Sequence, residues 1–222
     1  MSTPPPVLSP AEARVLAVLV EKERTVPDTY PLSLNALVAG CNQKTNRDPV
    51  TNLSEAEVQE AVDGLRRRSL VIESSGGRVM RYAQNMKRVL GVPSESIALL
   101  TTLMLRGPQT TAELRMNAER LQRFSDASAL EAFLTELAEW GPGPLVLLLP
   151  RAPGARESRW VHLLCGPVDV SSFPVASEPR PAASGSAQGE IAELRQRVGD
   201  LEHEVDALRE RLARVCTELG ID

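Results

Sequence analysis

The pattern of apolar and polar positions predicts one arrangement of elements twice, over residues 9–84 and again over 94–164. Each copy begins with three segments whose apolar residues recur every three or four positions, as on one face of a helix. Each ends with two short apolar runs around a turn, which is typical of a hairpin. The third helix of each copy has the same apolar spacing: Val58, Val62 and Leu65 in the first, Leu130, Leu134 and Leu137 in the second. Such self-similarity predicts a tandem repeat.

Capping residues set the expected helix starts in the first copy. Ser9 and Ser54 are each followed three residues later by a glutamate, which makes a capping box. Two serines and two glycines after the third helix favour a tight hairpin turn. The expected helices cover 9–23, 33–41 and 54–69, and the expected strands cover 70–73 and 79–82.

The second copy has the same order of elements with different surroundings. Its first helix, from Ser94, is apolar on nearly every side, so we expect it to lie between the two domains. Thr110 with Glu113 and then Asp126 start its second and third helices. The strands are expected over 145–149 and 160–164, with a long loop between them.

Three helices followed by a hairpin predict a winged-helix domain, so the fold class is mainly α with small β-hairpins (α+β). From 170 the chain turns to Pro, Ser, Ala and Gly, a composition typical of a flexible linker. The predicted organisation is a disordered N-terminus over 1–8, winged-helix domains over 9–92 and 93–169, a linker over 170–189 and a coiled coil over 190–220.

The C-terminal segment has apolar residues alternately three and four positions apart over about four heptads, which predicts a coiled coil. In a parallel pair, Glu190 faces Arg195, Arg197 faces Glu202 and Glu204 faces Arg209, and every pair attracts. We therefore predict a parallel homodimer; the alternative is an amphipathic helix that packs on its own domains. The dimerisation positions are Ile191, Leu194, Val198, Leu201, Val205, Leu208, Leu212, Val215 and Leu219.

Composition narrows the possible settings and partners. The net charge is −4 and aromatic residues make up 3%, which argues against a stacking platform for single-stranded nucleic acid. Residues 1–92 carry 12 Lys and Arg against 10 Asp and Glu, so any phosphate contact is expected there. Three distant cysteines, no signal sequence and no long apolar run predict a reduced, cytoplasmic protein without a membrane partner.

Candidate contact residues lie around the third helix and hairpin of the first copy. The run Arg66 to Arg68 ends that helix, where cations also stabilise the helix dipole. A solvated helix end is the plainer interpretation, and acids such as Glu55 and Glu60 on the same helix oppose phosphate. The candidate contacts with nucleic acid or a partner are Lys44, Arg47, Arg66, Arg67, Arg68, Arg78 and Arg81.

A polar loop over 41–49 makes the connection between helices two and three unusually long. Its side chains either contact phosphates or a protein partner, or form a hydrogen-bonded Asn/Asp/Pro turn, and the residues favour both equally. With its neighbours this loop resembles the YceH-like family of bacterial proteins, which implies a tandem winged-helix fold and a bacterial cytoplasm but no catalytic or ligand residues. The resemblance rests on Glu21 to Glu23, Tyr30 to Asn35, Cys41 to Lys44, Asn46 to Val50 and Leu105 to Thr110.

No catalytic, cofactor-binding or metal-ligating pattern is evident, and neither His162 nor His203 has an acid and a nucleophile beside it. We therefore expect no enzyme activity, no cofactor and no small-molecule substrate. Two functions stay open at about even odds: a coiled-coil-dimerised regulator that binds double-stranded DNA, and an adaptor that uses its winged helices to dock a protein. DNA binding is slightly favoured because most winged helices bind DNA.

Overall fold

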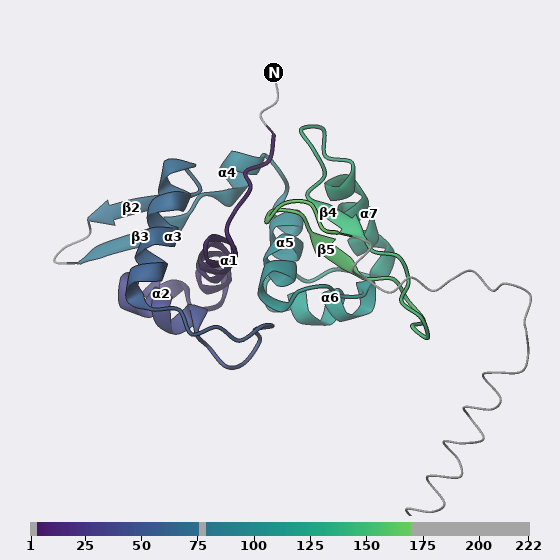
Figure 1. Cartoon of the computed structure of the whole chain (residues 1–222), viewed down its shortest axis with the longest axis horizontal. Coiled ribbons are helices and arrows are strands. Elements are labelled where there is room, and N and C mark those ends of the chain that lie inside the picture. Colours follow the sequence, from purple (N-terminus) through teal and green to yellow (C-terminus); the bar gives the residue numbers. More distant parts are fainter. Residues whose placement is uncertain (1–3, 76–78, 170–222) are drawn as a thin grey trace, which may run out of the picture. The chain divides into compact units, whose positions relative to one another are not determined.

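Within the residues that the structure describes, 4–75 and 79–169, the chain has an α+β architecture of short helices and small antiparallel sheets (Figure 1). The structure is a computed structural model. Both repeats fall within one unit, Met1–Ala176. Arg78, the predicted linker and the predicted dimerisation positions lie outside the described residues. The predicted boundary between residues 92 and 93 stays a prediction.

The first repeat contains the predicted helices, and each begins at a capped residue. Ser9 and Ser54 both form complete capping boxes, and the side chain of Ser33 accepts a hydrogen bond from the backbone of Ala36. These caps satisfy backbone N–H groups that a helix start leaves without partners. The elements are α1 (Pro10–Thr25), a 3-10 turn η1 (Pro27–Thr29), β1 (Leu32–Ser33), α2 (Leu34–Cys41), α3 (Glu55–Arg67), β2 (Val71–Ser75), β3 (Met80–Gln84) and α4 (Met86–Leu90).

The sheet of the first repeat has three strands rather than the two that were predicted. Its order is β1-β3-β2, and both pairings are antiparallel. Leu32 of β1 lies opposite Tyr82 of β3, and Tyr82 lies opposite Glu73 of β2. A two-residue strand has no alternating pattern of its own, so the pairing of β1 is decided by tertiary packing.

The second repeat has the same order of helices and a smaller sheet. Thr110 forms a capping box, and the carboxylate of Asp126 accepts a hydrogen bond from the N–H of Ala129 at 2.8 Å. Its strands pair with Val146 opposite His162. The elements are α5 (Ser94–Arg106), α6 (Thr111–Ala118), α7 (Ala127–Ala138), β4 (Val146–Leu148) and β5 (Trp160–His162).

The two repeats meet through α1 and α5, which pack side by side (Figure 1). Residues 96–105 of α5 are all buried, and so are 12–20 of α1. Thr101 and Thr102 satisfy their buried hydroxyls by donating to the carbonyls of Ile97 and Ala98 at 2.7 and 2.8 Å. The prediction that α5 lies between the two repeats is confirmed, and one apolar core includes side chains of both.

The prediction of a disordered start over residues 1–8 is wrong at Leu8. Its side chain is buried, and its N–H donates to the carbonyl of Leu164 at 2.7 Å. The segment before α1 is thereby attached to the end of the second repeat. A single apolar residue among prolines gives no periodic signal, which is why the sequence pattern does not reveal this contact.

Candidate interaction surfaces

Arg47 of the polar loop lies in the interior, not on a surface. Its Nη2 is 2.6 Å from Oε2 of Glu21, and its Nη1 is 3.2 Å from Oε1. Nε and Nη2 also donate to the carbonyl of Gly40, and the side chain has no exposed area. The expectation that Arg47 contacts phosphate is therefore corrected, because its donors are used inside the protein.

Two further titratable side chains, Arg14 and Cys41, lie near this ion pair. Burial alone raises the pKa of Glu21, but the hydrogen bonds and charge of Arg47 outweigh it and keep that pKa below its ordinary value. Arg14 is buried nearby, donates to the carbonyl of Pro49 at 2.7 Å, and has a pKa lowered by burial and by Arg47. Burial also raises the pKa of the Cys41 thiol to about 12, so this thiol stays protonated.

The polar loop is held at both ends by hydrogen bonds and also joins the repeats. The side chain of Asn42 both donates to the carbonyl of Leu53 and accepts from its N–H, each at 2.7 Å. The N–H of Asp48 donates to the carbonyl of Leu105 in α5 at 2.8 Å. Asn42, Arg47 and Asp48 thus act as structural ties, while Lys44 is exposed.

Two of the three arginines at the end of α3 form ion pairs within the first repeat. Arg66 pairs with Glu73 of β2, and Arg68 pairs with Glu12 of α1 at 2.6 Å. Arg67 is exposed and has no ion pair among the described residues. The run therefore does not act as one free cationic surface, because intramolecular carboxylates already neutralise two of its members.

The candidates that remain exposed without a carboxylate partner in the described part of the chain are Lys44, Arg67 and Arg81. Arg81 lies on β3 opposite Ser74 of β2, and its Nη1 donates to the carbonyl of Pro31 at 2.8 Å. These three come from the polar loop, the end of α3 and the hairpin. Of the described candidates, Arg47, Arg66 and Arg68 are thus paired with carboxylates of the protein itself, and Lys44, Arg67 and Arg81 are exposed on different elements.

The second repeat contains a groove that the sequence pattern did not reveal. It has a volume of about 1310 Å³ and lies between α6, α7 and the hairpin of β4 and β5. Phe124 and Trp160 contribute nearly buried rings, whereas Met116 and Leu148 are 73% and 46% exposed. Large apolar side chains in a concave surface are typical of interaction sites. A signal was available, since 145–149 is apolar on both faces of its strand.

Carboxylates border this apolar groove. Glu113 pairs with Arg159 at 2.9 Å, and Glu119 pairs with Arg123 at 3.3 Å. Glu131 of α7 and Glu157 of the hairpin loop also line the groove, and neither forms an ion pair within the described residues. Arg115 also lines the groove, donates to the carbonyl of Ser125 at 3.2 Å and forms no ion pair in this part of the chain. The groove therefore combines an apolar floor with a border on which glutamates outnumber arginines.

The comparisons with known proteins place this architecture in a family. A family model described as "Protein of unknown function, DUF480" matches residues 8–155. The chain belongs to this family. It is 59% identical over 215 residues to a UPF0502 protein of Leptothrix cholodnii, which covers 97% of this chain and 96% of the relative. It is 58% identical over 217 residues to a UPF0502 protein of Acidovorax sp., which covers 96% and 95% respectively. The predicted membership of an uncharacterised bacterial family is confirmed.

Within residues 4–75 and 79–169 of this DUF480 family member, no group of three or more His, Cys, Asp or Glu has the arrangement of a metal site. Burial lowers the pKa of His162 to about 4, so this imidazole is neutral at physiological pH. The helices in that part of the chain are too short or too polar to cross a bilayer.

Proposed function

We propose that this protein is a non-enzymatic, cytoplasmic adaptor built of two winged-helix domains, whose second repeat docks a basic amphipathic helix of a partner protein. The observation that carries the proposal is the groove with exposed Met116 and Leu148 beside Glu131 and Glu157. An amphipathic helix in an apolar groove is a common mode of peptide recognition. The excess of carboxylates over cations at its border favours a helix with Lys or Arg beside the apolar stripe.

The order of elements supports the winged-helix assignment. Each repeat has three helices followed by an antiparallel hairpin, and β1 adds the third strand that lies next to the hairpin in the first repeat. In this fold the third helix commonly reads DNA from the major groove. Here the exposed side of α3 begins with Glu55, and α7 has Glu131 and Glu136 but neither Lys nor Arg. These helices therefore favour a protein partner over a phosphate backbone.

Charge also favours a separate partner over the chain's own C-terminal segment. Residues 170–222 carry 6 Lys and Arg against 10 Asp and Glu, so this segment is acidic like the border of the groove. A basic helix avoids that repulsion. The predicted parallel coiled-coil dimer would present two such grooves to a bivalent partner, which raises apparent affinity without a new contact.

The test is a charge exchange in the full chain. Two designed helical peptides carry the same leucine stripe, one with lysines and one with glutamates beside it, and calorimetry measures the affinity of each. We expect the lysine peptide to bind, and we expect Glu131→Lys with Glu157→Lys to weaken it at least about tenfold and to favour the glutamate peptide. The matched control is Glu55→Lys with Glu60→Lys on α3, which leaves both affinities unchanged. Failure of both peptides to bind, or equal effects of the two variant pairs, contradicts the proposal.

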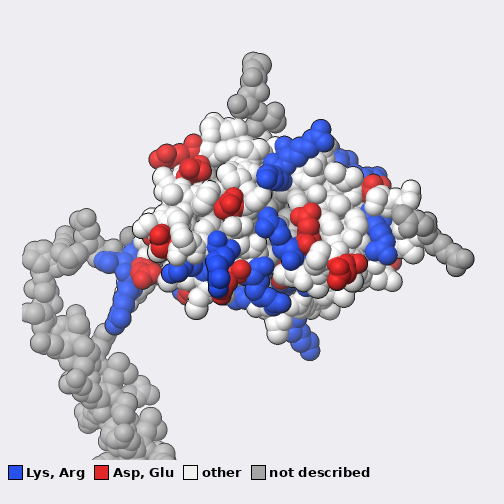
Figure 2. All heavy atoms as spheres, turned by 180° about the vertical axis from the view of Figure 1, so that it is seen from behind, with Lys and Arg blue, Asp and Glu red and all other residues white. Residues whose placement is uncertain are grey.

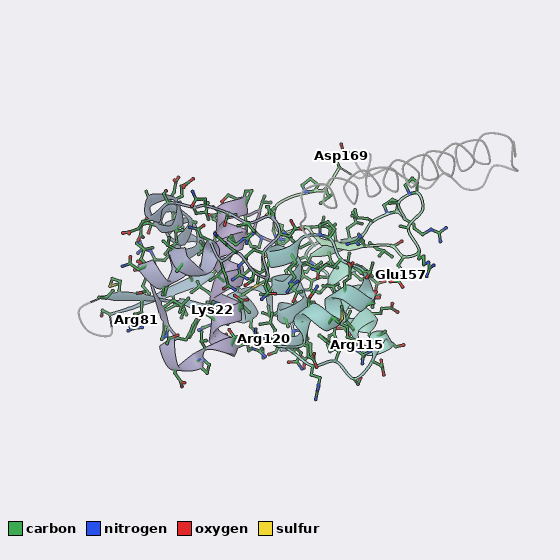
Figure 3. The ribbon with its side chains drawn as sticks, turned by 90° about the horizontal axis from the view of Figure 1, so that it is seen from below. Lys22, Arg81, Arg115, Arg120, Glu157 and Asp169 are labelled. Atoms are coloured by element: carbon green, nitrogen blue, oxygen red, sulfur yellow. The ribbon has the colours of Figure 1, made fainter. Side chains whose placement is uncertain are left out.

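DNA binding is the second candidate, and one arrangement favours it. Arg81, Lys22, Arg120 and Arg115 follow one another across the view in Figure 3, from β3 of the first repeat to α6 of the second. Figure 2, which shows the molecule from behind relative to Figure 1, has groups of Lys and Arg toward its lower middle, with acids among them, and another group toward its upper right. A row of cations of this kind can follow a duplex backbone without reading bases.

The two candidates differ in their dependence on salt. Phosphate contacts make duplex affinity fall steeply as salt rises, whereas an adaptor shows little affinity for duplex at any salt. Binding of random duplex DNA over a salt series is therefore compared between the full chain and its Arg81→Glu and Arg115→Glu variants, which alter the two ends of this row. Tight, salt-sensitive binding that these changes weaken supports the regulator; weak binding at low salt supports the adaptor.

A further inference from the structure

A polar cleft lies where the two repeats meet, and it differs in every respect from the apolar groove. Its volume is about 270 Å³, and it is formed by the end of α1, the polar loop, the end of α5 and the residues at and after the end of α6. Three cations line it: Lys22, Arg106 and Arg120. Both repeats therefore contribute positive charge to one small space.

The carboxylate in this cleft does not cancel these charges. Glu21 lines the cleft, but its two oxygens accept hydrogen bonds from the buried guanidinium of Arg47 at 2.6 and 3.2 Å. Lys22 forms a longer ion pair with the same carboxylate, with its Nζ 3.4 Å from Oε2 of Glu21. One carboxylate is thus shared by the buried Arg47 and by Lys22, which leaves the cations of the cleft in excess.

Neutral side chains of the polar loop position two of the three cations. Lys22 Nζ donates to Oε1 of Gln43 at 3.1 Å, and the guanidinium of Arg106 donates to the side-chain carbonyl of Asn46. Arg120 is exposed and forms no hydrogen bond or ion pair within the described residues. Figure 3 shows Lys22 and Arg120 as neighbours in this view, although they belong to different repeats. Each cation keeps donors for a ligand, because a guanidinium has five N–H groups and an ammonium three.

We propose that this cleft binds a small phosphate-bearing anion, which Lys22, Arg106 and Arg120 contact from both repeats. Arginine guanidinium groups match the geometry of phosphate oxygens in pairs, and lysine adds a point charge. The volume suits a phosphate with a short substituent and lies below the usual range for larger ligands. The polar loop then has a ligand-related role, because Gln43 and Asn46 orient two of the cations and Arg47 neutralises the acid.

The experiment measures saturable binding of inorganic phosphate and of pyrophosphate to the full chain, by calorimetry at an ionic strength fixed with sodium chloride. We expect one site per chain, and tighter binding of pyrophosphate because it carries more charge. Arg106→Gln with Arg120→Gln should weaken binding at least about tenfold. Arg120→Gln alone should weaken anion binding several-fold. This variant should also stay folded, because the Arg120 side chain forms no hydrogen bond or ion pair within the described residues. The control is Arg151→Gln with Arg156→Gln, exposed in the hairpin loop of the second repeat, which should bind as the unchanged chain does.

Two results would overturn the proposal. One is the absence of saturable binding by either anion, or equal weakening by the control pair. The other is duplex DNA binding that requires Arg106 and Arg120 while neither small anion binds, which would assign these cations to a nucleic-acid backbone. Neither result bears on the groove of the second repeat, because the peptide test alters Glu131 and Glu157 instead.

Discussion

The third helices of the two repeats have equivalent cores and opposite surroundings. Val58, Val62 and Leu65 of α3 are fully buried, and so are Leu130 and Leu134 of α7. Outside these positions, Arg66 and Arg68 at the end of α3 pair with neighbouring acids, whereas α7 contributes Glu131 to an open apolar groove. The comparison teaches that the shared spacing specifies the core, and that divergence of the exposed positions determines what each repeat can bind.

One position shows how this divergence arises. Gly64 of α3 has Glu136 of α7 as its counterpart when the core residues are matched. A Cβ on Gly64 would overlap Oε1 of Glu12, the carboxylate that pairs with Arg68. Because Gly64 has no side chain, α1 can approach α3 closely enough for Glu12 to pair with Arg68. The equivalent side of α7 carries an exposed glutamate instead.

The largest effect is expected where the first repeat has an elaboration that the second lacks. Glu21→Gln removes the charge opposite buried Arg47 and should lower the free energy of unfolding by about 3 to 5 kcal/mol. Urea denaturation measures this change. The matched control is Glu119→Gln, which removes an exposed pair with Arg123 and should cost less than about 1 kcal/mol. Equal costs for the two variants would mean that the buried pair does not brace the loop.

Gly64→Ala should lower the free energy of unfolding by about 2 kcal/mol, even though alanine favours helix over glycine. The added methyl displaces Glu12 and breaks its ion pair with Arg68. Glu136→Ala at the equivalent position of α7 should change stability by less than about 0.5 kcal/mol. Denaturation of both variants is sufficient, and a stabilised Gly64→Ala protein would contradict the close packing of α1 on α3.

The second repeat should carry most of the pH dependence between pH 7 and 5. Because the folded pKa of His162 is lowered to about 4 from 6.5, the unfolded chain binds the proton more readily in this window. Stability is thus complete above pH 6.5 and declines as the pH falls toward 4. The free energy of unfolding lost at pH 5 should be about 1 kcal/mol. This is roughly half of what the whole pKa shift would give at that pH, because the side chain keeps some contact with solvent. His162→Gln should reduce the difference between the denaturation midpoints measured at pH 7 and pH 5. If that difference is unchanged, the pH dependence of stability arises from other groups.

The smallest effect on stability is expected at the groove itself. Met116→Gln should change the free energy of unfolding by less than about 0.5 kcal/mol, because that side chain is 73% exposed. The variant should nevertheless weaken binding of the lysine peptide several-fold, since it removes apolar contact area from the proposed site. Leu114, two residues earlier on α6 and fully buried, is the contrasting position: Leu114→Ala should cost about 2 to 5 kcal/mol. A large loss of stability in Met116→Gln would show that Met116 belongs to the core.

Dimerisation is tested separately, because its residues lie outside the described part of the chain. Ending the chain after Ala187 removes all the predicted heptad positions and should convert a dimer to a monomer in light scattering. A dimer that survives this truncation would refute the predicted coiled coil.

The sequence predicted the parts of the fold that local chemistry decides. Ser9, Ser54 and Thr110 begin helices as expected, because a cap and its glutamate satisfy backbone groups within one turn. It did not predict β1, whose strand pairing depends on β3, or α4, which begins without a side-chain cap. These elements are decided by distant contacts that no local pattern encodes.

The candidate surfaces were predicted less well for a related reason. A basic residue in a polar loop gives the same sequence pattern whether its side chain is exposed or buried. Lys44 is exposed, whereas Arg47 of the same loop is buried against Glu21. Charge in sequence does not reveal which side chains are already paired, so Arg66 and Arg68 were also grouped with free cations. The groove was not predicted because Met116 and Leu148 have the sequence pattern of core residues, although both are exposed in the fold.

The central claim is that the second repeat, through its groove, is the partner-binding half. The most direct measurement is amide hydrogen exchange of the full chain with and without the lysine peptide, read segment by segment. The account predicts slowed exchange in α6, α7 and the loop between β4 and β5, with α3 and the hairpin of β2 and β3 unchanged. Protection centred on α3 and its hairpin, or no protection at a saturating peptide concentration, would contradict it.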